Sequence, residues 1–165
     1  MTCMFSTDSP DAILFSLWLH LTEHFGWLIE HSSLMWGDIV LKTPSMSDPF
    51  LIYKPQNGEV QSLDPLYANP GKKLSTDYHK WTFACLFTGD PRCPVAVCEA
   101  YKNTRPPCFD VPSTWFYLDP KSDWSPTEKV WFSMKPVLKS RLNQFAIIAA
   151  SKAQLLGWPA KPRGT

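Results

Sequence analysis

The chain has 165 residues, a length that suits one globular domain able to bury roughly two thirds of the surface its unfolded form exposes. Apolar residues make up 44% of the chain and charged residues 19%, a balance that excludes an intrinsically disordered protein. The formal net charge of +1 gives no overall attraction to nucleic acid or to a membrane surface, so either partner would require a local basic patch.

A helix is predicted near the N-terminus. Ser9 and Pro10 are residue types favoured at a helix N-cap and at the first helical position. Apolar residues then recur at the spacing of one helix face, and Gly26 ends the pattern. This stripe consists of Ile13, Leu14, Leu17, Trp18, Leu21 and Phe25.

A small antiparallel sheet is predicted in the middle of the chain. Residues 39–41 and 50–53 are short apolar runs, and residues 81–87 are apolar and aromatic, as is typical of strands. Asn57-Gly58 favours a hairpin turn, so we expect the chain to return from residues 50–53 through residues 60–63.

Two more helices are predicted in the second half, on either side of an extended segment at residues 115–118. The first begins at Pro94 and ends before Arg105, because a residue that precedes proline disfavours the α conformation. The last helix ends at Gly157. One of its faces is expected to carry Val137, Arg141 and Gln144, and its apolar stripe Leu138, Leu142, Phe145 and Ala149.

Together these elements predict a single α+β domain over residues 1–165, structured from about residue 10 to residue 158 and followed by a basic tail at residues 159–165. No run approaches the roughly 18 apolar residues of a membrane span, and the first ten residues lack the features of a signal peptide. The five cysteines are odd in number and form no C-x-x-C pair, which indicates reduced thiols in an intracellular protein. They are Cys3, Cys85, Cys93, Cys98 and Cys108.

His20, Glu23 and His24 form an H-x-x-E-H pattern, which is similar to the motif of inverted zinc peptidases. Two imidazoles one helical turn apart can share a metal, and Glu99 is a candidate third ligand. However, we expect both histidines to lie on the solvated or half-buried flank of the first helix. We therefore predict no metal and no other cofactor.

Other catalytic motifs are also missing from the sequence. It has no glycine-rich phosphate loop and no G-x-S-x-G elbow. A thiol nucleophile would require Cys85 or Cys93 to meet His79, and nothing in their spacing favours this over ordinary packing. We predict that the chain is not an enzyme and takes no small-molecule substrate.

A series of aromatic, histidine and glycine landmarks runs through residues 13–157. They are Trp18-Leu19-His20, His24-Phe25-Gly26, Glu30-His31, Leu34, Trp36-Gly37-Asp38-Ile39, Cys93-Pro94-Val95, Tyr101-Lys102, Thr104-Arg105-Pro106, Phe116-Tyr117-Leu118, Trp131-Phe132 and Pro136. In order and spacing they resemble a domain derived from Crypton transposons, which ends several zinc finger MYM-type and glutamine-rich proteins of animals. The resemblance implies a tyrosine-recombinase-like fold, with helices around a small sheet.

A working recombinase of this kind holds the scissile phosphate with two arginines, a lysine and a histidine, and a tyrosine attacks it. Here Trp27-Leu28-Ile29 follows Gly26, where the family places Leu-Arg. The hairpin lysine is expected near residues 53–61, where Lys54 is followed by Pro-Gln-Asn-Gly. The remaining ligands and the nucleophile are expected beyond Thr165. The resemblance therefore implies a degenerate domain, incomplete at its C-terminus and without recombinase activity.

The resemblance implies a non-catalytic nuclear module that acts in DNA or chromatin-protein binding and in transcription regulation. The candidate DNA-binding residues are Lys72, Lys73, Lys135, Lys139 and Arg141, with Lys161 and Arg163 in the tail. They neutralise few phosphates, so binding is expected to be weak and strongly salt-dependent. One alternative is a protein-interaction scaffold without a nucleic-acid role, which would use exposed aromatics such as Trp115, Trp124 or Trp158. Another is a gene fragment without a stable function.

The family-motif residues are expected to be structural. Trp36 is a candidate core residue together with Leu34 and Ile39, Gly37 suits a turn, and Asp38 is expected to satisfy backbone donors. Glu30 and His31 are expected to form a hydrogen-bonded pair that holds the first helix to the sheet. The motif set is Glu30, His31, Trp36, Gly37, Asp38, Cys93, Pro94 and Arg105.

Overall fold

The fold combines α-helices with small antiparallel sheets, as seen in a computed structural model that describes residues 6–25, 29–43, 45–46, 48–54, 82–83, 90 and 92–155. The predicted α+β class is confirmed. In chain order the α-helices and strands are α1 (Pro10–Phe25), β1 (Ile39–Lys42), β2 (Phe50–Tyr53), β3 (Thr82–Phe83), α2 (Pro94–Thr104), β4 (Leu118–Pro120), β5 (Phe132–Pro136) and α3 (Lys139–Leu155). Short 3-10 helices cover His31–Ser33, Trp36–Asp38 and Pro107–Phe109.

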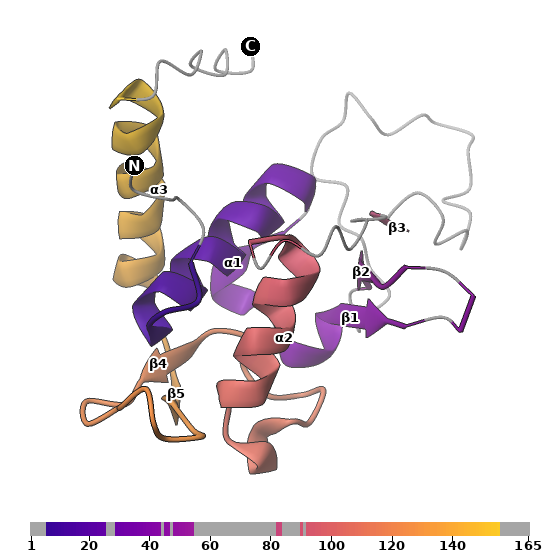
Figure 1. The fold of residues 1–165 in the computed structure, drawn as a ribbon. Coiled ribbons are helices and arrows are strands. Elements are labelled where there is room, and N and C mark those ends of the chain that lie inside the picture. Colours follow the sequence, from indigo (N-terminus) through magenta and orange to yellow (C-terminus); the bar gives the residue numbers. More distant parts are fainter. Residues whose placement is uncertain are drawn as a thin grey trace, which may run out of the picture.

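Helix α1 is the central helix and contacts both α2 and α3 (Figure 1). It begins as predicted, because the Ser9 hydroxyl accepts a hydrogen bond from the Ala12 backbone N–H at 3.1 Å. Its predicted apolar stripe is buried along the whole helix. Burying these six side chains stabilises the fold by roughly 1.5–3 kcal/mol each relative to leaving them in water.

Strands β1, β2 and β3 form one antiparallel sheet in that order. Residue 39 pairs with residue 53 across β1 and β2, and residue 51 pairs with residue 83 across β2 and β3. The strands predicted at 39–41 and 50–53 are confirmed, and β3 covers part of the predicted run 81–87. The predicted turn at Asn57-Gly58 and the return through residues 60–63 lie outside the described residues.

Strands β4 and β5 form a second antiparallel sheet, in which Leu118 pairs with Pro136 and Pro120 with Phe132. The sequence predicted an extended segment here but no second sheet. Only the first residue of β5 is buried, so this strand lacks the alternating apolar pattern by which a strand is recognised in sequence.

The centre of the core is aromatic and lies where α2 meets the second sheet. The Tyr101 ring contacts the Phe132 ring edge-on at a centroid distance of 4.8 Å, and the Phe116 and Tyr117 rings meet at 4.9 Å. The Tyr101 hydroxyl donates to the Phe116 carbonyl and accepts from the Leu118 N–H at 2.8 Å. A buried tyrosine thus gains a large apolar contact while its polar atom stays hydrogen-bonded.

Helix α3 lies beside α1 at the edge of the molecule (Figure 1). Leu142 and Phe145 are buried as predicted, but Leu138 is 73% exposed, so its place in the apolar stripe is wrong. The reason is that Leu138 precedes the helix. Val137 is buried in its place, and its backbone N–H donates to the Tyr117 carbonyl at 3.0 Å. The predicted end at Gly157 lies outside the described residues.

Candidate functional site

Arg105, at the C-terminal end of α2, is the centre of the family-motif residues. It is only 3% exposed, and its guanidinium donates to the carbonyls of Phe109, Trp115 and Phe116 at 3.0, 3.2 and 2.7 Å. Desolvation by burial lowers the pKa of this guanidinium from its ordinary value. Arg105 therefore holds the loop between α2 and β4 in place through backbone carbonyls, which leaves it no role at the surface.

Trp36 covers Arg105 on one side. The guanidinium carbon lies 4.0 Å from the centroid of the Trp36 ring, a cation–π contact, and the indole also stacks on Phe116 at 5.7 Å. The indole N–H donates to the Asp110 carboxylate at 2.7 Å. These contacts place Trp36 at the edge of the core, where it fixes the loop that Arg105 organises.

The two residues after Trp36 form hydrogen bonds with backbone groups of nearby segments. The Gly37 N–H donates to the Pro112 carbonyl at 3.0 Å, so the chain passes close to the loop before β4. Asp38 is buried, and its carboxylate accepts from the Met35 N–H at 2.8 Å. The carboxylate thus satisfies a backbone donor at the turn that leads into β1.

His31 is not held by Glu30, which corrects the predicted pair. Glu30 is exposed, and its carboxylate accepts from the Ser32 hydroxyl at 3.1 Å. The His31 ring instead turns inward, where its centroid lies 5.3 Å from the Trp18 ring. It does link the first helix to the segment at Tyr117, but through its own two ring nitrogens.

The hydrogen bonds of His31 have a defined direction. The Thr22 hydroxyl donates to the Trp18 carbonyl at 2.7 Å, so it accepts from Nε2–H of His31 at 2.9 Å. Nδ1 of His31 then accepts from the Tyr117 hydroxyl at 2.7 Å. This chain of donors requires a neutral imidazole, and burial lowers the pKa of His31 to about 4.

Tyr117 is unsuited to nucleophilic attack in this environment. Its side chain is buried, and desolvation raises the pKa of the phenol well above its ordinary value. Its hydroxyl is engaged with His31. The phenol therefore serves the buried hydrogen-bonded chain, and its place before the last helix is also wrong for the nucleophile of the family that the sequence resembles.

The motif residues Cys93 and Pro94 form the start of α2. The Cys93 sulfur accepts from the Ala96 N–H at 3.4 Å as the N-cap, and Pro94 occupies the first turn. Within α2, burial raises the pKa of the Cys98 thiol to about 12, which makes this thiol a poor nucleophile. Cys85 and His79 lie outside the described residues.

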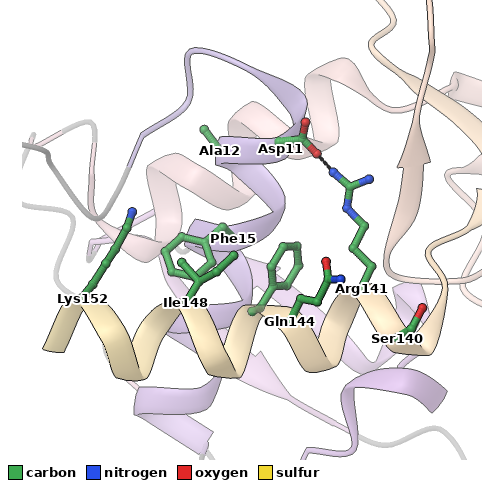
Figure 2. A pocket seen from close by; sticks show the side chains of 9 residues that line it. Asp11, Ala12, Phe15, Ser140, Arg141, Gln144, Ile148 and Lys152 are labelled. Atoms are coloured by element: carbon green, nitrogen blue, oxygen red, sulfur yellow. Dashed lines mark hydrogen bonds and ion pairs between the residues drawn. The ribbon is translucent and has the colours of Figure 1, made fainter. Parts of the chain in front are cut away.

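The candidate DNA-binding residues do not all remain available as cations. Lys135 on β5 and Lys139 at the start of α3 are exposed. Arg141 instead forms an ion pair with Asp11 at the start of α1 (Figure 2), which neutralises much of its charge. Lys72, Lys73, Lys161 and Arg163 lie outside the described residues.

The aromatic residues proposed for protein contact are placed differently from one another. Trp115 is 43% exposed, whereas Trp124 is half-buried, with its ring 5.3 Å from that of Trp131. Trp158 lies outside the described residues. Of these three tryptophans, Trp115 is the one that the structure places as an exposed side chain.

A surface that the sequence reasoning missed is the outward side of α3. Ile147 is 67% exposed, and Asn143, Ala146, Ala150 and Ser151 beside it are exposed as well. From residue 140 to residue 151 the single charged residue is Arg141, which faces α1 (Figure 2). The scarcity of charged residues in this helix is visible in the sequence and is unusual, because the solvated side of a helix normally carries charged residues.

His20, Glu23 and His24 lie together on the last turns of α1. One candidate ligand atom from each lies within 4.8 Å of the others, and the two imidazole rings stack at a centroid distance of 6.1 Å. His20 is buried, which corrects the expectation that it lies on a solvated or half-buried flank. His24 is half-buried and Glu23 exposed. Among the described residues this cluster does not include Glu99.

These features define a mixed α+β domain whose motif residues organise its core and loops. A family model described as Domain of unknown function (DUF3504) matches residues 2–148, and the chain belongs to that family. Neither a curated protein nor a solved structure matches it. In the part of the chain that the structure describes, no helix has the length and apolar character needed to cross a membrane.

Proposed function

We propose that this chain is a non-catalytic protein-binding module and that the outward side of α3 is its binding surface. The observation that carries the proposal is that every exposed side chain of α3 from residue 140 to residue 151 is uncharged, with Ile147 near the middle of this surface. We define the α3 surface as Ser140, Asn143, Ala146, Ile147, Ala150 and Ser151, which recur at helical spacing on the side opposite Leu142 and Phe145.

The composition of the α3 surface suits a helix as its partner. Alanine and serine side chains are short, so the backbone of a second helix can approach closely, and Ile147 can fill a gap between side chains of that helix. A surface without charged groups is not attracted electrostatically to the phosphate backbone of a nucleic acid. Its contacts would be apolar at the centre with amide and hydroxyl groups at the rim, as in protein interfaces.

The non-catalytic part of the proposal rests on what the motif residues do. Arg105 bonds backbone carbonyls, and Tyr117 bonds His31 in the interior. Neither side chain is available to bind a phosphate. The resemblance to Crypton-derived domains also identified no residue of this chain that replaces the missing phosphate ligands. The same resemblance supports a nuclear location and a role in chromatin-protein binding and transcription regulation, which we include in the proposal.

Ile147→Asp is expected to abolish partner binding without unfolding the protein. The side chain is exposed, so the substitution should change the free energy of unfolding by less than about 1 kcal/mol, while a buried charge at an interface centre costs several kcal/mol of binding. Asn103→Asp adds the same charge at an exposed position of α2 and is the matched control. Affinity capture from nuclear extract, quantified by mass spectrometry, should give proteins retained by wild type and by Asn103→Asp and lost with Ile147→Asp. Identical protein sets for all three would contradict the proposal.

Weak DNA binding is the second candidate function, and the exposure of Lys135 and Lys139 is the observation that favours it. With three or four phosphate contacts, the logarithm of the affinity should fall with the logarithm of the salt concentration at a slope of about −3. Mobility shifts at several salt concentrations measure this slope, and the double change Lys135→Ala, Lys139→Ala should flatten it. No binding at low salt would reject the DNA role and leave the protein-binding module. A covalent adduct on a nicked suicide substrate would contradict the non-catalytic assignment.

A further inference from the structure

The ring of His20 is oriented by a backbone carbonyl. Its Nε2 lies 2.8 Å from the Arg92 carbonyl oxygen, in the segment immediately before α2. A carbonyl oxygen can only accept a hydrogen bond, so Nε2 carries the proton, and the lone pair of the neutral ring is on Nδ1. Histidines that bind metals in proteins are oriented in this way, with one nitrogen donating to a carbonyl and the other facing the ion.

The second histidine of the cluster lies on the same side of α1 as His20, because residues four apart in a helix are neighbours. His24, one helical turn later, stacks its ring on that of His20 at an interplanar angle of 16°.

We propose that Nδ1 of His20, an imidazole nitrogen of His24 and the carboxylate of Glu23 bind one Zn²⁺ ion at the end of α1. Two imidazoles and one carboxylate are a donor set that zinc accepts, with water in the fourth position of a tetrahedron, and that calcium and magnesium disfavour. This proposal replaces the expectation of no metal, which depended on a solvated or half-buried His20. It is independent of the α3 surface.

The geometry requires only a small adjustment. Ligand atoms bound at about 2.0–2.1 Å in a tetrahedron lie about 3.3 Å apart, and one candidate ligand atom of each of the three residues, either ring nitrogen in the case of a histidine, lies within 4.8 Å of the others. Glu23 is exposed and His24 half-buried, so these two side chains have room to change rotamer while His20 stays fixed. Glu23 is used here as a ligand, which leaves no general base and separates this site from a peptidase centre.

Zinc titration of the EDTA-treated full chain at pH 7.5, followed by isothermal calorimetry, tests the proposal. We expect one ion per chain, with Glu23→Gln weakening binding by about 10-fold and His24→Ala by about 100-fold or more. His31→Gln removes a histidine outside the cluster and should leave the zinc affinity unchanged. Circular dichroism checks that each variant is folded.

Two further measurements distinguish this site from zinc held by thiols. In ¹⁵N NMR spectra, zinc should shift the Nδ1 resonance of His20 and leave its Nε2 protonated. The cobalt(II) complex should lack a thiolate charge-transfer band. Absence of binding at about 100 µM Zn²⁺, far above the micromolar range in which such sites are useful, would overturn the proposal. Equal affinity of wild type, Glu23→Gln and His24→Ala would overturn it as well.

Discussion

Replacing Arg105 with methionine should lower the free energy of unfolding by roughly 4 kcal/mol or more. Methionine fills much of the same volume but donates no hydrogen bond, so the carbonyls of Phe109, Trp115 and Phe116 lose their common partner. The cation–π contact with Trp36 is lost as well. Hydrogen bonds from a charged donor contribute about 1.5–3 kcal/mol each, which makes this the largest single-residue effect we expect.

Urea denaturation followed by tryptophan fluorescence measures this change. Lys102→Met, on the exposed side of the same helix, is the matched control and should change the free energy of unfolding by less than about 0.5 kcal/mol. Arg105→Lys keeps the charge and some of the donors, so it should fall between the two. Equal stability of Arg105→Met and Lys102→Met would show that Arg105 does not hold the loop.

Acidification should destabilise the protein through His31. Its pKa is about 4 in the folded state and 6.5 in the unfolded state, so between these values the unfolded chain binds more protons. The contribution of His31 to stability is therefore complete above about pH 6.5 and is lost as the pH falls toward 4. Integration gives a loss of about 2–3 kcal/mol between pH 7 and pH 4.5.

His31→Gln isolates this contribution, because an amide can accept from Tyr117 and donate to Thr22 but does not titrate in this range. Urea denaturation at pH 7 and pH 4.5, in the presence of EDTA, should show a steeper loss of stability for wild type than for His31→Gln. All other groups contribute equally to both proteins. The same pH dependence in the two proteins would mean that His31 titrates in the folded state as it does in the unfolded chain.

The elements that local sequence determines were the ones that could be predicted. Helices α1 and α2 begin at Pro10 and Pro94 because a cap and a proline at the first turn favour those starts. Strands β1 and β2 are compact apolar runs. The second sheet was missed because β5 has little apolar patterning. Its place is set by pairing with β4 across the intervening loop, which the local sequence of β5 does not reveal.

The candidate sites depend on long-range contacts and were predicted less well. His20 lies at the edge of the apolar stripe of α1, and its burial follows from the segment at Arg92, which is distant in sequence. The partners of His31 and the ion pair of Arg141 with Asp11 are likewise distant. In contrast, the low charge of α3 could be read without tertiary information, since the sequence has Arg141 as its single charged residue from residue 140 to residue 151.

Site-specific photo-crosslinking at position 147 tests the protein-binding proposal most directly. A photoreactive phenylalanine analogue replaces Ile147 in one variant and Lys102, exposed on α2, in the control, and both are irradiated in nuclear extract. We predict crosslinks from position 147 to the same polypeptides that Ile147→Asp fails to retain, and no such crosslinks from position 102. Crosslinks to nucleic acid alone, or equal protein crosslinks from both positions, would contradict a protein-binding surface on α3.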